Sequence, residues 1–198
     1  FSHNVIAVNG SAMPDAWQGR LLGADPLHRH LVLSERSVRG ASFTTRDIGF
    51  PVKNSDVAFR PVYIANAPDG SLLIADFYER YIAHGQHYQS QIDPTSGRVS
   101  RLRAKAKPLV ADTNLSAKTD GQLIGLLAHP NKWHRQTAVR LLGQRATAVT
   151  NAQLRKQIKA ETGLAALHGL WALHQAGGLD DAFAAELLGH PYPHVRSW

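Results

Sequence analysis

The sequence predicts a β-then-α fold class: a partial β-propeller of about two antiparallel blades, followed by an α-solenoid of HEAT-like helical repeats. Three observations predict it. Short apolar stretches separated by turn residues fill the first half, an apolar hairpin ending in Asp-x-Tyr spans residues 60–78, and helix-period segments recur in the second half. We therefore expect blades in residues 1–103, a linker in 104–118 and truncated repeats in 119–198.

Four short strands are expected first, at residues 3–9, 20–24, 30–35 and 41–47. Four strands in an antiparallel meander make one blade. The hairpin at 60–76 begins a second blade, and its turn, Pro68-Asp69-Gly70, combines a proline-preset φ with a glycine that accepts positive φ. Residues 97–103 would be the third strand of that blade, and no fourth strand is evident after them.

Two blades cannot close a propeller, and alone they would expose strand edges and apolar faces. The chain begins Phe-Ser-His and ends as a helix is starting. We therefore expect both ends to be cuts, with upstream blades of the same protein as partners. No apolar run reaches the length of about 18 residues that a membrane-spanning helix needs. The absence of cysteine excludes disulfides, thiolate metal sites and a Cys-x-x-Cys-His haem attachment within this chain.

Helix signals dominate the second half. Thr-x-x-Gln capping boxes begin at Thr119 and Thr150, and Asp180 offers a third start. These starts lie about 30 residues apart and predict paired helices in a solenoid. The expected helices are 119–128, 132–145, 150–160, 161–176 and 180–189. Leu-Leu-x-His-Pro recurs in this segment, and we interpret His129 and His190 as C-terminal caps that face the helix dipole.

The net charge is +7, from 22 Lys and Arg against 15 Asp and Glu. Five of the basic residues gather in one stretch: Arg98, Arg101, Arg103, Lys105 and Lys107. Such a cluster is either a patch for nucleic acid or anionic surfaces, or a solvated strand edge. Because no aromatic residues are interleaved for base stacking, we favour the solvated edge and expect no nucleic-acid partner.

Polar residues at the strand ends are the candidates for chemistry. Arg60 opens an inner strand, where it would hold an anionic cofactor or form a structural ion pair with Asp76. Asp76 would hold Ca²⁺ or substrate hydroxyls, or cap a loop through backbone N–H groups. Tyr78 and His84 lie in a long insertion that would bind sugar or pack over a neighbouring blade. His3 begins an inner strand and would face the same channel.

His28 and His30 are a separate candidate. They lie two residues apart, which places both on one face of the expected strand and suits a transition metal. No third ligand is evident from the sequence, so a solvated face is the favoured interpretation.

An ordered set of motifs carries a family resemblance. The motifs are His3-Asn4, Phe59-Arg60-Pro61, Pro68-Asp69-Gly70, Ala75-Asp76-x-Tyr78, His84, Gly97-Arg98, and Leu-Leu-x-His-Pro followed by Arg135. In this order the chain resembles the C-terminal part of the planctomycete-type membrane-bound dehydrogenases, which join a glucose/sorbosone dehydrogenase-like propeller to HEAT-like repeats. Ala67 and Ala58 depart from the pattern, which has glycine and an aromatic residue at those places.

The resemblance implies a parent oxidoreductase for a sugar or similar alcohol, with pyrroloquinoline quinone (PQQ) and Ca²⁺, in a periplasmic or membrane-associated setting. Arg60, Asp76, Tyr78, His84 and His3 would then bind substrate or cofactor, with Asp76 as the metal ligand. The catalytic base would lie on the upstream blades, so this chain alone would be inactive. The alternative is a non-catalytic propeller and HEAT scaffold, whose helical repeats bind a protein partner.

Overall fold

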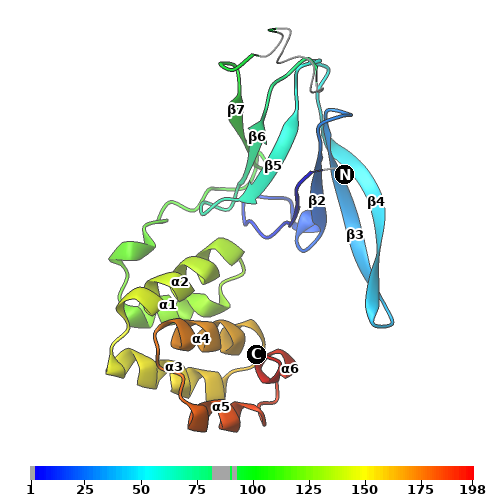
Figure 1. Ribbon diagram of the computed structural model, residues 1–198. Helices are drawn as coiled ribbons and strands as arrows, with labels where there is room; N and C mark the ends of the chain where they lie inside the picture. The colour runs from blue at the N-terminus through cyan, green and yellow to red at the C-terminus, as the bar shows by residue number, and fades with distance from the viewer. Residues whose placement is uncertain (1–2, 82–89, 91–92) are drawn as a thin grey trace. The chain divides into compact units, whose positions relative to one another are not determined.

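The computed structural model describes residues 3–81, 90 and 93–198 (Figure 1). The chain divides into two compact units, Phe1–Ala111 and Asp112–Trp198, which we call the β-unit and the helical unit. The β-unit holds two open antiparallel sheets and the helical unit holds the helices. The predicted order, β then α, is confirmed.

The first sheet is a four-stranded antiparallel meander in the order β1-β2-β3-β4. Its strands are β1 (Val5–Ala7), β2 (Leu21–Asp25), β3 (His30–Arg39) and β4 (Ser42–Lys53). The last two strands are longer than predicted because they continue as a long two-stranded ribbon (Figure 1). Most residues of that extension are exposed on both faces. It therefore lacks the alternation of buried and exposed residues by which a strand is recognised.

The second sheet has the order β5-β6-β7, with strands β5 (Pro61–Asn66), β6 (Leu72–Asp76) and β7 (Arg98–Leu102). The predicted turn between the first two is confirmed: Gly70 has φ +86° and donates its N–H to the Ala67 carbonyl at 3.1 Å. Within the described residues, no fourth strand joins this sheet.

The two sheets share one apolar core. Its buried members are Val8, Met13, Leu22, Ala24, Leu31 and Leu33 around the first sheet, and Ile64, Leu72 and Ile74 in the second. Hydrogen bonds also join the segments around β1 and β5. The Ile64 N–H donates to Asn4 Oδ1 at 2.9 Å, and the Asn66 amide donates to the Ala7 carbonyl at 2.9 Å. The first strands of the two meanders are therefore neighbours.

The helical unit contains α1 (Asp120–Gly125), α2 (Lys132–Arg145), α3 (Ala148–Ala160), α4 (Gly163–Gln175), α5 (Asp181–Leu187) and α6 (Pro193–Arg196). Helix α4 contacts α2, α3 and α6, and α1 contacts both α2 and α3. One apolar cluster fills the space between the helices, with fully buried leucines at 123, 127, 142, 154 and 173. No helix among the described residues has the length and apolar character needed to cross a bilayer.

One of the two predicted capping boxes is confirmed. Thr119 Oγ1 accepts the Gln122 N–H at 3.3 Å, and Gln122 Oε1 accepts the Thr119 N–H at 2.9 Å. The box predicted at Thr150 is wrong, because α3 begins earlier and is capped by Thr147, whose hydroxyl accepts the Thr150 N–H at 3.3 Å. The Thr150 hydroxyl instead donates to Asp120 Oδ2 at 2.6 Å.

The prediction that His129 and His190 cap the carbonyl ends of the helices before them needs correction. Each ring Nδ1 accepts the backbone N–H two residues further on, from Asn131 at 3.0 Å and from Tyr192 at 3.1 Å. Both imidazoles therefore bond the turn that leads into the following helix, and His190 Nε2 also lies 2.9 Å from the Ile158 carbonyl in the last turn of α3. This pairing fixes the ring in the turn, because the N–H donors at a helix start have no partner within the helix.

Candidate functional site

Loops from both sheets meet at one end of the β-unit, which we call the rim: residues 25–30, 59–61 and 76–80. The Arg60 guanidinium joins these loops. It donates to the carbonyls of Pro26 at 3.0 Å, Glu79 at 2.8 Å and Arg80 at 2.9 Å. Arg60 is only 9% exposed. Burial, then repulsion from Arg29, lowers its pKa, and the opposing charge of Asp76 raises it.

Asp76 is buried, and its carboxylate bonds backbone N–H groups and Arg98 rather than the Arg60 guanidinium. Oδ1 accepts the backbone N–H of Arg60 at 2.7 Å and that of Tyr78 at 3.0 Å, while Oδ2 lies 3.3 Å from Arg98 Nε. The loop-capping role considered for Asp76 is the one that these contacts show. The ion pair considered between the Arg60 and Asp76 side chains is replaced by the pair with Arg98. Both oxygens thus face N–H donors, an arrangement that does not fit the oxygen cage that Ca²⁺ requires.

The remaining predicted site residues are distributed unevenly. The Tyr78 ring lies 3.7 Å from the Arg98 guanidinium, and Tyr78 has a left-handed φ of +53°. His3 is exposed just before β1. His84 lies outside the described residues. The structure therefore brings Arg60, Asp76 and Tyr78 together around one loop.

A cavity of about 620 Å³ adjoins this loop, and its lining includes Asp76, Glu79, Asp93 and Arg98. Glu79 is buried, and its Oε1 accepts the Asp93 N–H at 2.7 Å. Three carboxylates against one guanidinium give the lining a negative balance. An anionic quinone needs cationic donors, so these residues do not fit PQQ.

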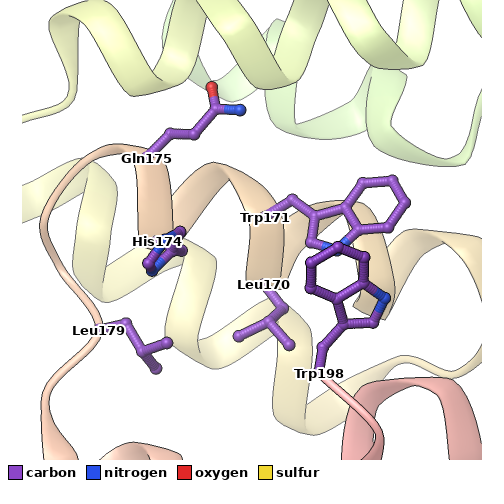
Figure 2. A pocket seen from close by; sticks show the side chains of 6 residues that line it. All are labelled: Leu170, Trp171, His174, Gln175, Leu179 and Trp198. Atoms are coloured by element: carbon purple, nitrogen blue, oxygen red, sulfur yellow. The ribbon is translucent and has the colours of Figure 1, made fainter.

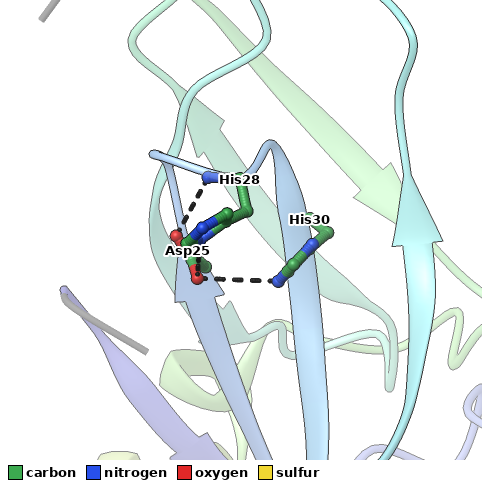
Figure 3. A group of neighbouring side chains, drawn as sticks. All are labelled: Asp25, His28 and His30. Carbon is green, nitrogen blue, oxygen red and sulfur yellow. Dashed lines mark hydrogen bonds and ion pairs between the residues drawn. The ribbon is translucent and has the colours of Figure 1, made fainter.

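A second group of the rim is built by the β2–β3 turn (Figure 3). Asp25 and His30 are register partners across the two strands, and His28 lies in the turn between them. The prediction that both histidines share one strand face is therefore wrong, because β3 begins only at His30. Asp25 supplies the third ligand-type group that sequence reasoning missed, and all three ligand atoms lie within 4.8 Å of one another.

The charges of this group influence each other. Burial tends to raise the pKa of Asp25, but hydrogen bonds from His28 and the nearby imidazoles bring it below the ordinary value. Burial lowers the pKa of His30, with Lys53 and His28 adding to that shift and Asp25 opposing it. The spacing Asp-x-x-His-x-His across a turn is the sequence signal that could have found the group.

The basic stretch that follows β6 is largely paired with acids. Arg101 lies 2.6 Å from Asp69 and Lys107 lies 2.8 Å from Asp15, while Arg98 pairs with Asp76. These pairs reduce the positive field that nucleic-acid binding would use.

The helical unit has its own apolar cavity, of about 340 Å³ (Figure 2). Its lining is Leu170, Trp171, His174, Gln175, Leu179 and Trp198. The two indole rings meet edge to face, with centroids 5.3 Å apart. Such a lining suits an apolar side chain better than a charged ligand.

Residues 2–106, more than half of the chain, match the family described as a domain of unknown function, DUF7133. The chain belongs to this family. The matched residues include both sheets and the rim and end before the helical unit. No curated protein and no solved structure matches the chain.

Proposed function

We propose that this chain is the C-terminal portion of a propeller-type sugar or alcohol dehydrogenase-like protein, with two blades in the β-unit and a HEAT-like interaction module in the helical unit. The observation that carries the proposal is the relation between the two sheets. Two consecutive meanders share one core, and hydrogen bonds join the segments around their first strands. Neighbouring propeller blades, arranged around a central channel, have this relation.

An exposed apolar face of the second sheet is a reason to propose further blades. Tyr63, Ala75 and Val99 are register partners across β5, β6 and β7, on the face opposite the buried Ile64 and Ile74. Tyr63 is 57% exposed and Val99 is 70% exposed. An apolar row of this kind indicates a surface that another element covers. In this proposal the cover is an upstream blade of the same protein.

The helical contacts support a repeat module. Helix α1 contacts α3, while α2 contacts α4 and α4 contacts α6, so alternate helices lie in two layers. The sequence His-Pro followed by arginine makes the same contacts twice. Arg135 donates to the carbonyls of residues 129 and 130, and Arg196 donates to those of 190 and 191. Repetition of a contact set in stacked helix pairs is typical of a solenoid.

The dehydrogenase part of the proposal rests on the ordered motifs and their resemblance to the planctomycete-type enzymes. Arg60 and Asp76 hold the rim together, so the proposal assigns the catalytic residues, PQQ and Ca²⁺ to other blades. The role left to this chain is to shape the rim beside that site. A periplasmic or membrane-associated setting is part of the same proposal.

The cofactor test uses the intact protein that carries this chain, purified without chelators. We expect stoichiometric calcium, a quinone absorption band, and oxidation of sugars or alcohols with an artificial electron acceptor. A protein with neither cofactor, and with no activity after both are added, would overturn the enzyme assignment.

The blade test compares two exposed valines. Val99→Asp places a charge on the apolar row, and we expect it to destabilise the intact protein by about 2 kcal/mol or more, because the covering blade leaves the carboxylate without water. Val38→Asp, on the 76% exposed ribbon valine, is the control and should change stability by less than about 0.5 kcal/mol. Equal, small effects in thermal unfolding of the intact protein would contradict a covering blade.

The second candidate function is a non-catalytic scaffold, in which the helical unit binds a protein. The observation that favours it is the apolar cavity of the helical unit, whose Trp198 is 77% exposed. Trp198→Glu should then abolish capture of a specific partner by the intact protein, with His194→Ala as the control. Capture that is unchanged by Trp198→Glu would count against this cavity as the binding site.

A further inference from the structure

We propose that Asp25, His28 and His30 form a binding site for a divalent transition metal, with Zn²⁺ as the ion that this ligand set fits best. Two imidazole nitrogens and one carboxylate oxygen are the donor types that zinc takes in sites with three protein ligands. The three ligands lie at the β2–β3 turn, outside the motifs that carry the dehydrogenase assignment. The proposal therefore stands or falls separately from that assignment.

The three donor atoms already converge on one point (Figure 3). Asp25 Oδ2 lies 2.8 Å from His28 Nδ1 and 3.5 Å from His30 Nε2. Tetrahedral zinc with bonds of about 2.1 Å separates its ligand atoms by roughly 3.4 Å. The His30 distance meets that value, and the His28 ring needs to move outward by roughly half an ångström. The His28 side chain is 70% exposed, so nothing buried opposes that movement.

The neighbours of the ligands hold them in place. Asp25 Oδ1 accepts the His28 N–H at 3.1 Å, which leaves Oδ2 directed at both rings. The His30 ring stacks on His28 at 5.6 Å and contacts the Phe50 ring at 4.5 Å. Ligands whose orientation is fixed before binding lose less conformational entropy when the metal arrives.

The turn itself is also anchored. Arg60 donates to the Pro26 carbonyl at 3.0 Å, and Arg29 adopts a left-handed φ of +59° that returns the chain to β3. The turn is thus fixed by a buried side chain from the second sheet. A flexible surface pair of histidines would have no such support.

The Lys53 ammonium should weaken the affinity of this site for a metal ion. Lys53 is the register partner of His30, and its ammonium lies 4.9 Å from the centroid of the Phe50 ring. Its charge repels a bound cation, while the Asp25 carboxylate attracts it. Replacing the lysine should therefore tighten metal binding if the metal sits where we propose.

Three protein ligands leave zinc with an open position. Because the His28 side chain is 70% exposed, we expect this position to face solvent. Water would occupy this position, or an oxygen atom of a small ligand that reaches the rim. A bound zinc ion would thus add an electrophilic centre to the rim. The Arg60 and Asp76 side chains there are already hydrogen-bonded to backbone groups.

The experiment titrates the full chain, free of tag histidines, with ZnCl₂ by calorimetry and with CoCl₂ by visible absorption. We expect one metal equivalent, and intense Co²⁺ d–d bands that report four-coordinate geometry. His28→Ala and Asp25→Asn should each weaken binding roughly tenfold or more, and Lys53→Met should tighten it about threefold. The control, His194→Ala, removes an exposed imidazole of the helical unit and should leave the affinity unchanged.

The proposal is overturned if the wild-type chain binds no equivalent of metal. It is equally overturned if His28→Ala binds as tightly as the wild type. Circular dichroism confirms that each variant is folded. If Asp25→Asn unfolds the β-unit, His28→Ala and Lys53→Met still decide the outcome, because both side chains can be replaced without opening the core.

Discussion

Two buried arginines, one in each unit, both donate hydrogen bonds to backbone carbonyls, but the carbonyls lie at different separations along the chain. Arg60 in the β-unit donates to carbonyls of Glu79, Arg80 and Pro26, which are 19, 20 and 34 residues away. Arg135 in the helical unit donates to carbonyls of His129 and Pro130, six and five residues away. Both side chains donate to backbone carbonyls that lie outside the helices and strands.

The difference determines how each contact arises. The contacts of Arg135 need only one helix start, and they recur wherever the same spacing recurs, as at Arg196. The contacts of Arg60 exist only after both sheets have packed and the turn at Pro26 has reached the start of β5. The β-unit is thus held by a central residue, and the helical unit by repeated local ones.

The largest effect that would test this contrast is expected from Arg60→Ala. Loss of three charge-assisted hydrogen bonds, with carbonyls left unpaired, should destabilise the β-unit by about 3 kcal/mol or more. Hydrogen exchange measured by mass spectrometry should show faster exchange throughout residues 4–80. Peptides from 120–198 provide the internal control and should be unchanged. A loss below about 1 kcal/mol would show that Arg60 is not central.

A smaller effect is expected from Arg135→Ala, and the matched variant Arg196→Ala sharpens the contrast within the repeats. Arg135 is 8% exposed, whereas Arg196 is exposed at the end of the described helices. We expect losses of about 2 kcal/mol and about 0.5 kcal/mol, respectively, because water can replace the bonds of the exposed residue. Denaturation of the helical unit, followed by circular dichroism, measures both. Equal losses would mean that burial does not decide the value of this contact.

The smallest effect concerns pH and should distinguish the buried histidines of the helical unit from an exposed one. Burial lowers the pKa of His168, and burial followed by repulsion from His134 lowers that of His129. Below the ordinary histidine pKa of about 6.5, the unfolded chain therefore binds protons that the folded unit does not. The free energy of unfolding of the helical unit should therefore have its full value above that pH and decrease as the pH falls below it.

The measurement is the urea midpoint of the helical unit at several pH values between about 7.5 and 5. His168→Gln should flatten the dependence, while His194→Ala, at an exposed position, should leave it as it is in the wild type. A wild-type midpoint that does not move over this range would contradict the burial argument.

Features that depend on neighbours in the chain could be predicted from the sequence. The order β then α, the meander of the first sheet, the turn at Gly70 and the capping box at Thr119 all follow from period, turn residues and short-range hydrogen bonding. The error at Thr150 is also local, because two threonines three residues apart, Thr147 and Thr150, compete to cap one helix. The Thr150 hydroxyl instead donates to Asp120, which lies in another helix.

The composition of the rim was decided only by the tertiary structure. Arg60 and Asp76 lie at adjoining strand ends, as expected, but their partners, Pro26 and Arg98, lie far along the chain. Asp25 joins His28 and His30 only because the β2–β3 register sets it opposite His30. The sequence by itself determined the order of the elements, the turn at Gly70 and the helix start at Thr119, since turn and cap hydrogen bonds connect near neighbours. Which charged groups share a site depended on strand register and sheet packing, which no local spacing specifies.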